Sequence, residues 1–382
     1  MSDIKSVVVD VGSCFIKAGL AGDEVVRRLP NAKVYGVTSS ASFDFAMGEQ
    51  AVAQAHTQGT PETVQRTKFM QGGEIVDVDG LEEVLEYLYA EELRLPAEEQ
   101  PLLLVASDLQ SKETRELLCQ MVFEKIGVPA FYTGGHGIMS LFSVGKSSGI
   151  AVDIGDESTR IVIAEDGKVY PSSVMKIPVG GATVAAQFMD VIGKEQFPTF
   201  WHELRARELS SKLCTVPLWP RDRNMDTTPC EIQLLPDSAP IRVASNKLRE
   251  CTSTLLSPQS AGIECNSIAH TIYDSFNTLD GVVKAERGPS DRERDREALS
   301  NIVLCGGGSV LPGLSDRVQR ELEGIVPSSR SVRSTLAEDA ENAAWMGAAM
   351  LADLKSFESL WCGRREYDEM GPLIVNKKCV TG

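Results

Sequence analysis

The chain has 382 residues, of which 42% are hydrophobic, so it is long enough to form two or three domains with their own cores. Its 54 acidic and 38 basic residues give a net charge of −16, which argues against a nucleic-acid-binding surface. The nine cysteines include no CxxC pair, so neither a disulfide framework nor a zinc site is indicated. The first ten residues lack the pattern of a secretion signal, and no apolar run is long enough to cross a membrane. We therefore expect a soluble protein of a reducing compartment such as the cytosol, nucleus or cilium.

The first predicted element is a β-hairpin at residues 7–22. An apolar run containing Asp10 is followed by Gly12, a tight turn and a second apolar run. The same order returns at residues 150–167, with Asp153 in the place of Asp10. Two such hairpins facing each other across a cleft would direct backbone N–H groups and one carboxylate each at a phosphate–metal unit. The repeat therefore predicts a nucleotide-binding fold.

Helices and strands alternate between the two hairpins. Leucines and valines at helical spacing follow residue 80, and residues 101–107 read as a buried strand. Ser111 is expected to cap a helix that ends before Gly127 and Pro129, and a strand at 131–133 and a helix at 137–144 follow. The residues expected on the inner faces of the two helices are Leu81, Val84, Leu85 and Leu88 in the first, and Leu117, Leu118, Met121 and Val122 in the second.

The second hairpin differs from the first in its turn. It carries Asp156 and Glu157 where the first has Ser13 and Cys14, and this negative charge would weaken a phosphate site. We therefore expect slow or absent turnover of nucleotide.

Three segments follow the second hairpin. Residues 219–240 are rich in Pro, Asp and Arg and predict loop or short strands, and residues 284–297 form a highly charged stretch that reads as a solvated loop or helix face. Residues 301–322 read as strand, glycine turn and helix, with Leu314, Val318 and Leu322 facing inward. A ligand can press against the bare backbone of such a glycine turn.

Several stretches together resemble the actins and actin-related proteins. They are DVGSCFIKAGLAGD, VPAFYTGGHGIMSLFSVGKSSGIAVDIGD, SKLC, SAGI, CGGGSVLPGLSDR and the tail REYDEMGPLIVNKKC. The tail is typical of actin-like chains, so sugar kinases, bacterial division ATPases and heat-shock chaperones fit poorly.

The resemblance implies the actin fold, an α/β architecture of duplicated ribonuclease-H-like halves around a nucleotide cleft. It has four subdomains. The expected boundaries are 1–30 with 69–143 and 343–382 for subdomain 1, 31–68 for subdomain 2, 144–179 with 261–342 for subdomain 3, and 180–260 for subdomain 4.

The resemblance also implies a site for ATP or ADP with Mg²⁺. Asp10 and Asp153 would surround a hydrated magnesium ion. The nucleotide would contact four sets of residues: Gly12, Ser13, Cys14, Phe15 and Lys17 in the first loop, Gly155, Asp156 and Glu157 in the second, Arg207 near the base and ribose, and Gly306, Gly307, Gly308 and Ser309 near the nucleoside and α-phosphate.

The residues that position the attacking water in this family are altered. His136 and Arg160 stand where the family has Gln and His. We expect Arg160 to pair with Glu157, Asp156 or phosphate, because its charge is permanent. Glu157 either adds negative charge near the phosphates or turns out to solvent. Both substitutions predict little or no hydrolysis.

Two departures from the actin pattern argue against a filament of this chain alone. The segment 30–48 is about five residues shorter than the pattern, and LLSPQS at 255–260 lacks the apolar plug. Losing both contacts should leave a monomer or a single copy that caps or decorates another assembly.

The sequence also matches the surface on which actins bind partner proteins. Seven apolar residues correspond to the groove in which amphipathic helices of actin partners dock: Phe142, Val144, Met346, Met350, Leu351, Leu354 and Leu360. The alternative is that the helix at 343–360 packs inward. Residues 284–297 are a second candidate contact.

Three functions follow from the resemblance. The preferred one is a structural, nucleotide-binding subunit of a cytoskeletal complex, such as a ciliary dynein assembly or a dynein-activating complex. Its partners would be protein subunits, with conventional actin or dynein-associated chains as candidates, and it would contact neither nucleic acid nor membrane. The second is a nuclear subunit of a chromatin-remodelling complex, and the third is a slow ATPase that acts as a conformational switch.

Overall fold

The computed structural model describes residues 5–23, 26–31, 33–35, 45–47, 64–65, 69–198, 200–219, 222, 226–234, 239–287 and 298–379. The chain divides into two compact units. The first comprises residues 1–147, 166–171 and 342–382, and the second comprises residues 148–165 and 172–341. The finer division into four subdomains stays a prediction.

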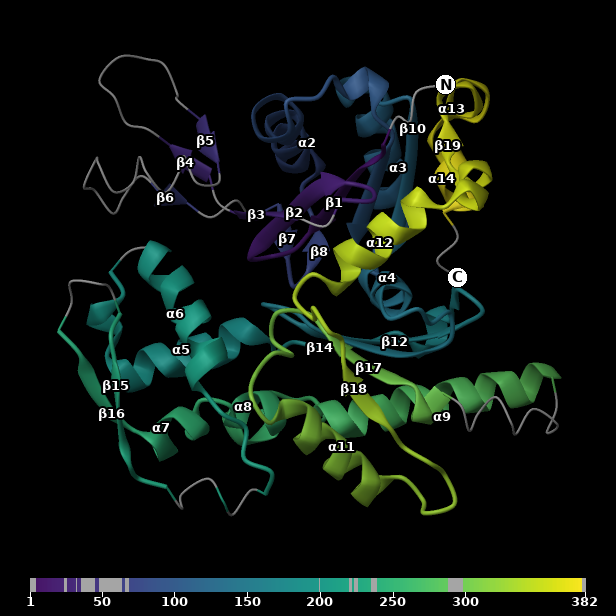
Figure 1. The fold of residues 1–382 in the computed structure, drawn as a ribbon. Helices are drawn as coiled ribbons and strands as arrows, with labels where there is room; N and C mark the ends of the chain where they lie inside the picture. Colours follow the sequence, from purple (N-terminus) through teal and green to yellow (C-terminus); the bar gives the residue numbers. More distant parts are fainter. Residues whose placement is uncertain are drawn as a thin grey trace. The chain divides into compact units, whose positions relative to one another are not determined.

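The first unit is built on a six-stranded sheet with the order β19-β10-β9-β1-β2-β3 (Figure 1). Its central strands β1, β9 and β10 are parallel, and β1, β2 and β3 form an antiparallel meander. The bounds are β1 Val7–Val11, β2 Phe15–Leu20, β3 Arg27–Pro30, β9 Leu102–Ala106, β10 Ala130–Gly135 and β19 Cys362–Gly363. Every residue of β1 and β9 is buried, as in parallel strands that are covered on both faces.

Helices α2, α3 and α4 of the first unit form where the sequence predicts helices, whereas α13 and α14 were not predicted. The side chain of Ser111 caps α3 by accepting from Thr114 N–H at 3.1 Å, and Gly127 ends the following π-turn in the left-handed conformation. The bounds are α2 Val78–Tyr87, α3 Lys112–Met121, α4 His136–Ser143, α12 Ala343–Asp353, α13 Arg364–Met370 and α14 Val375–Lys378, with helical turns at Leu88–Leu93, Ala97–Glu99, Val122–Ile126, Lys355–Leu360 and Gly371–Ile374.

The prediction that Leu117 lies on the inner face of its helix is wrong. Leu117 is 53% exposed, whereas Leu118, Met121 and Val122 are buried. The buried positions 118, 121 and 122 form a narrow stripe that continues into the π-turn, and Leu117 lies outside it. The inner face predicted for α2 is confirmed.

Helix α12 holds two site-bearing elements of the first unit together. Trp345 Nε1 donates to the carbonyl of Val8 in β1 at 3.0 Å. Gly347 packs so closely on α4 that an added Cβ would lie 1.7 Å from the Met139 carbonyl oxygen. One helix thereby fixes the strand that carries Asp10 and the helix that begins at His136.

The second unit is built on the sheet order β12-β11-β17-β18, with β14 beside β12. Strands β11 and β12 form the second predicted hairpin, and β11 and β17 are parallel. The bounds are β11 Gly149–Ile154, β12 Thr159–Glu165, β14 Met175–Ile177, β17 Ile302–Cys305 and β18 Ser334–Leu336, while β13 is Lys168–Val169. The predicted strand, turn and helix at 301–322 are confirmed, with Leu314, Val318 and Leu322 buried.

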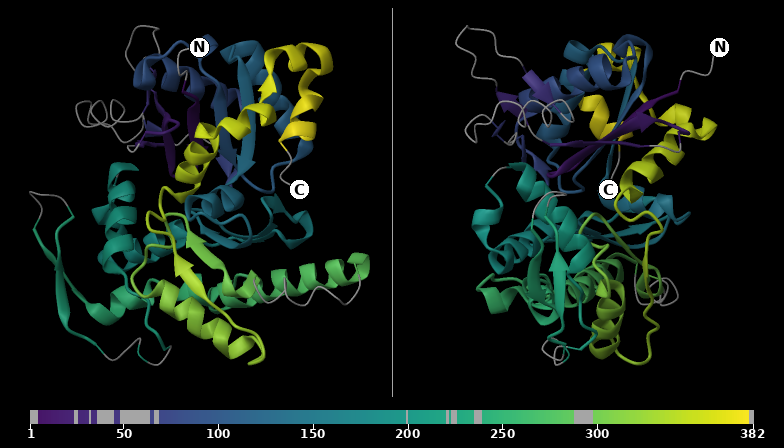
Figure 2. Two further views of the ribbon diagram at one scale, coloured as in Figure 1. Left: turned by 45° about the vertical axis from the view of Figure 1, so that its right-hand side comes forward. Right: turned by 60° about the vertical axis from the view of Figure 1, so that its left-hand side comes forward.

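Helices accompany this sheet and a separate small hairpin. Helices α9 and α11 lie side by side, as do α5 and α6 (Figure 2). The helix bounds are α5 Gly181–Ile192, α6 Phe200–Leu213, α7 Ser245–Glu250, α8 Ser253–Leu256, α9 Ile268–Arg287 and α11 Leu314–Ile325. Short helical turns lie at Pro171–Ser173, Lys194–Gln196 and Pro258–Ala261. The small hairpin consists of β15 Pro229–Ile232, which pairs with β16 Ile241–Ala244. Within the described residues, no helix is both long and apolar enough to cross a membrane.

The shortened segment 30–48 and the charged stretch 284–297 fall partly outside the described residues. In the shortened segment 30–48, the structure describes β4 Lys33–Tyr35 and β5 Phe45–Met47, which form a small sheet with β6 Val64–Gln65. A two-stranded pair, β7 Met70–Gln71 and β8 Glu74–Ile75, follows. Residues 284–287 of the charged stretch lie in α9, and 288–297 lie outside the described residues.

Candidate functional site

The turn of the first hairpin is locked by hydrogen bonds. It contains Gly12, Ser13, Cys14 and Phe15, and the Gly12 N–H donates to the Phe15 carbonyl at 3.1 Å. An added Cβ on Gly12 would lie 2.7 Å from that oxygen, so glycine is required for close approach. Asn31 donates from Nδ2 to the Gly12 carbonyl at 2.9 Å, and its N–H donates to the Cys14 carbonyl at 2.8 Å. The sequence analysis missed Asn31, which belongs to no motif.

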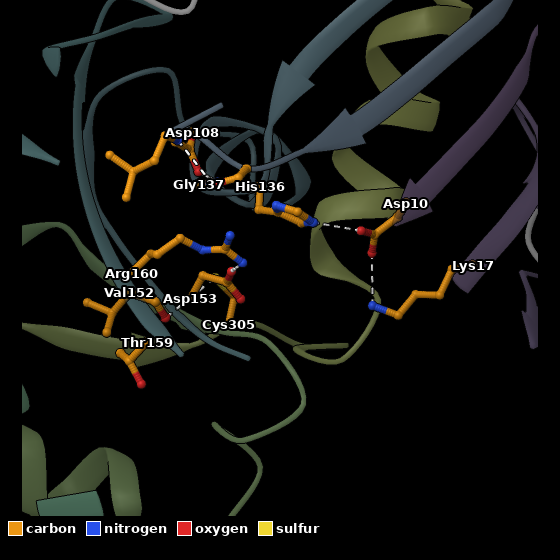
Figure 3. Close-up of polar contacts among 12 residues, drawn as sticks. Asp10, Lys17, Asp108, His136, Gly137, Val152, Asp153, Thr159, Arg160 and Cys305 are labelled. Carbon is orange, nitrogen blue, oxygen red and sulfur yellow. Dashed lines mark hydrogen bonds and ion pairs between the residues drawn. The ribbon is translucent and has the colours of Figure 1, made fainter. Parts of the chain in front are cut away.

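We call Asp10, its basic partners and the turn of the first hairpin the first half-site. Asp10 lies at its centre, between two basic side chains (Figure 3). Lys17 Nζ is 2.9 Å from Oδ2, and His136 Nε2 is 3.0 Å from Oδ1. Because Asp10 is only 2% exposed, burial alone would raise its pKa, but Lys17 and His136 outweigh burial and hold the pKa well below the usual value. Asp10 is therefore an ionised carboxylate with two cationic or hydrogen-bonding partners from its own chain.

The position of His136 is set by the start of α4. The Gly137 N–H donates to Asp108 Oδ2 at 3.0 Å, which satisfies one of the free N–H groups at the helix N-terminus. Because the ionised Asp10 can only accept, His136 Nε2 carries the proton that it donates. The other ring nitrogen, Nδ1, is buried without a hydrogen-bond partner among the described residues. Asp108 is a second positioning residue that sequence reasoning missed, since it follows a strand without any motif.

The second half-site has the same cross-strand pairing as the first. Asp10 lies opposite Lys17 in the first hairpin, and Asp153 lies opposite Arg160 in the second. Arg160 Nη2 is 2.9 Å from Asp153 Oδ2, and both residues are buried. The pairing of Arg160 with Glu157, Asp156 or phosphate stays a prediction, and the structure adds a partner that it did not name: the register of the hairpin places the guanidinium against Asp153, a buried carboxylate.

The turn of the second hairpin is engaged by other residues of the same unit. The carbonyls of Gly155 and Asp156 accept from the N–H groups of Gly181 and Ala182, both at 2.8 Å, at the start of α5. Arg207 Nε is 2.8 Å from Asp156 Oδ1, so the residue expected near the base and ribose also contacts the second loop.

Two acidic oxygens in this turn lack partners. Asp156 Oδ2 and Glu157 Oε2 are buried without a hydrogen bond to any described residue. Glu157 is only partly exposed, and it does not turn out to solvent. Arg207 offsets the charge of Asp156, so Glu157 is the acid of this turn whose negative charge most disfavours a nearby phosphate.

The glycine turn after β17 packs against the second hairpin. An added Cβ on Gly306 would lie 2.4 Å from Asp153 Oδ1, and one on Gly308 would lie 2.6 Å from an Ile154 side-chain carbon. Ser309 Oγ donates to the Gly306 carbonyl at 2.7 Å. Gly307 has no atom within 4 Å of an added Cβ, so it is the glycine of this turn with open space beside it. Packing alone accounts for Gly306 and Gly308.

The seven residues of the predicted partner groove all lie in the first unit, and several are exposed. Met350 is 49% exposed, Leu354 is 53% exposed and Leu360 is 44% exposed. Phe142, Val144, Met346 and Leu351 are partly exposed. The helix predicted at 343–360 ends at Asp353 and continues as a 3₁₀ turn, and its exposed side chains do not pack inward.

The comparison with protein families agrees with these features. The duplicated hairpins, their paired aspartates and the glycine turn after β17 all lie within residues 1–380, which match the model of the family described as Actin. The match covers almost the whole chain, and the mixed α/β architecture agrees with the actin fold. The chain belongs to the actin family.

Proposed function

We propose that this chain is a structural subunit of a cytoskeletal assembly, that it binds ATP or ADP, and that it hydrolyses little or no ATP. The observation that carries the proposal is the ion pairing of His136 with Asp10 and of Arg160 with Asp153. Both basic residues stand at the positions expected to order the attacking water. The Arg160 guanidinium, held against Asp153, is permanently charged and cannot accept a proton from water, and placement of the nucleophile supplies much of the rate in phosphoryl transfer.

Nucleotide binding has support in the first half-site. The ammonium group of Lys17 forms an ion pair with Asp10 at 2.9 Å, and the Lys17 side chain is 15% exposed. A lysine ammonium group is a common phosphate ligand in proteins because it brings a positive charge to the phosphate oxygens. The locked turn at Gly12 adds backbone rigidity, and bound nucleotide would then stabilise the fold through linkage without turnover.

Each of the two aspartates, taken within its own unit, is poorly suited to hold a hydrated magnesium ion. Both oxygens of Asp10 and one oxygen of Asp153 accept from basic side chains, and the other Asp153 oxygen lies against Gly306. Water molecules bound to Mg²⁺ would have to displace these contacts. We therefore propose that nucleotide affinity depends only weakly on Mg²⁺.

The expected absence of self-assembly has support at residues 257–262. The position of the apolar plug is a short 3₁₀ turn, Pro258–Ala261, in which Ser260 and Ala261 are exposed. Neither side chain offers the apolar area that a repeating subunit contact needs. We infer a single copy within a larger assembly of the cytoplasm or the ciliary axoneme.

Binding of partner proteins has support on the surface of the first unit. Met350, Leu354 and Leu360 expose large apolar side chains to solvent. A flexible Met and Leu surface suits the apolar face of an amphipathic helix. We propose that a helix from a neighbouring subunit, such as a dynein-associated chain or conventional actin, covers it.

Thermal melting and phosphate release test the nucleotide proposal together. We expect ATP and ADP each to raise the melting temperature of the purified chain, with similar shifts in Mg²⁺ and in EDTA, while phosphate release stays at the rate without protein. Lys17→Ala should lose most of the ligand-induced shift. Lys5→Ala is the matched control, because Lys5 forms an exposed ion pair with Asp23. Sustained phosphate release, or no shift with either nucleotide, would contradict the proposal.

A further inference from the structure

Two free thiols lie next to each other in the C-terminal part of the first unit. Cys362 is in β19 and Cys379 follows α14, and their sulfur atoms are 3.8 Å apart. Both are buried, with exposures of 0% and 1%. All nine cysteines of the chain are free thiols.

Strand β10 fixes both sulfurs. Cys362 pairs with Phe131 in the antiparallel ladder between β10 and β19. Two residues further along β10, the Thr133 N–H donates to Cys379 Sγ at 3.5 Å. The separation of the two thiols is therefore set by one buried strand and not by a chance contact of surface side chains.

A cation is held beside the pair. Lys378 Nζ donates to the Trp361 carbonyl at 2.7 Å and contacts Glu366 at 2.6 Å. The hydrogen bond with Cys379 and the charge of Lys378 lower the pKa of Cys362 and outweigh burial and the charge of Glu366, which raise it. Burial and the bond to Cys362 raise the pKa of Cys379. Cys362 therefore ionises first and Cys379 stays a thiol.

We propose that Cys362 and Cys379 are a redox modification site at which a peroxide forms a reversible intramolecular disulfide. The Cys362 thiolate attacks one oxygen of hydrogen peroxide and becomes a sulfenic acid, releasing hydroxide. The Cys379 sulfur then attacks the sulfenic sulfur, the S–O bond breaks, and water leaves. In total, two thiols and one peroxide give one disulfide and two waters. A dithiol reductant reverses the reaction by thiol–disulfide exchange.

The disulfide would restrain a defined segment. It would join β19 to the end of α14 and close a loop that contains α13 and the exposed side chains of Met370 and Leu373, which are 36% and 58% exposed. Because both sulfurs are buried, the oxidant reaches them only when the single turn of α14 opens. Oxidation would then hold α14 closed and restrain the apolar patch formed by Met370 and Leu373.

The second unit provides an internal control. Cys214 is hydrogen-bonded to Cys251 and lies near Cys230, and the pKa of Cys214 is raised by Cys251, by burial and by Cys230, with no cation contributing. The Cys251 thiol is occupied by a hydrogen bond that it donates to the Lys247 carbonyl at 3.3 Å. This pair should react with peroxide more slowly than Cys362 and Cys379.

The test is mass mapping of the reduced, full-length chain after treatment with hydrogen peroxide. Free thiols are alkylated, and the peptides are compared before and after reduction. We expect one linked peptide pair containing Cys362 and Cys379, about 2 Da lighter than the sum of its reduced parts. It should form before any Cys214–Cys251 link and disappear with dithiothreitol. Lys378→Gln should slow its formation several-fold, while Lys377→Gln, a change at an exposed neighbour, should not.

Three results would overturn the proposal. They are a Cys362 link to Cys119, which also lies near the pair, a Cys214–Cys251 link that forms at least as fast, and oxidation of Cys362 to sulfinic acid without any link. The mapping uses the unmodified chain, so it does not depend on whether a variant folds. Equal rates for Lys378→Gln and the unmodified chain would remove the part assigned to the lysine.

Discussion

The two hairpins place an aspartate and a basic residue in the same register and then differ in what surrounds the pair. Asp10 lies opposite Lys17 and also binds His136, so both of its oxygens have basic partners. Asp153 lies opposite Arg160, and its second oxygen faces the backbone of Gly306. A repeated motif therefore preserves the cross-strand pair, while the neighbouring elements decide whether the carboxylate has one basic partner or two.

The largest loss of stability should come from removing Arg160, because Asp153 has no second basic partner among the described residues. Arg160→Gln leaves Asp153 buried without a cation, and we expect it to lower the free energy of unfolding of the second unit by about 3–5 kcal/mol. Lys17→Gln should cost less, because Asp10 keeps His136. Urea denaturation of the two variants without nucleotide checks the difference.

A double variant separates lost charge pairing from lost packing. Asp153→Asn combined with Arg160→Gln removes both charges and should recover most of the stability lost in Arg160→Gln alone. If the double variant is as unstable as the single one, the ion pair is not the reason for the loss.

The ionisation of Asp10 gives a pH dependence with a defined sign. Its folded-state pKa lies below the ordinary 3.8, so its contribution is fully present above pH 3.8 and is lost as the pH falls further toward the folded-state pKa. Asp10→Asn should therefore be less stable than the parent chain at pH 7, by about 2 kcal/mol, and the difference should shrink below pH 4. Denaturation midpoints of both chains between pH 7 and pH 3 measure it, and a constant gap would contradict the assignment.

Removing the Glu157 carboxylate from the turn of the second hairpin should stabilise the fold. Glu157 Oε2 is buried without a hydrogen bond, so Glu157→Ala should raise the free energy of unfolding by about 1 kcal/mol or more. The lost negative charge should also tighten ATP binding several-fold. Glu264→Ala, at an exposed acid of the same unit, is the control, and calorimetric titration with ATP should show no change for it.

The sequence predicted the elements of this molecule better than its contacts. The hairpins, α3 and the strand–turn–helix at 301–322 follow from local patterns of apolar residues, caps and glycines, and their bounds are close to those expected. The partner of Arg160 depended on the length of the turn, which fixes the register between β11 and β12. A motif aligned with the family carried no information on which carboxylate would face residue 160.

Positioning residues from distant segments left no sequence signal. Asp108 follows a strand and accepts from the first turn of α4, and Asn31 follows β3 and binds the turn between β1 and β2. Each is one ordinary polar residue in a loop, and only the packed structure brings it to its partner. Such residues are found by asking where the free backbone groups of a turn or helix end find their hydrogen bonds.

Asn31 gives the smallest predicted effect and the sharpest test of how the first turn is held. Asn31→Ala removes a hydrogen bond to the Gly12 carbonyl at 2.9 Å but keeps the backbone bond to Cys14, so the loss should be about 1 kcal/mol. Asn266→Ala removes a comparable but exposed side-chain bond to Asp274 and should cost less, because water replaces it. If the turn must be rigid to meet a phosphate, Asn31→Ala will also weaken ATP binding by more than its loss of stability accounts for, whereas Asn266→Ala will leave binding unchanged. Equal ATP affinity in both variants would mean that the backbone bonds alone hold the turn.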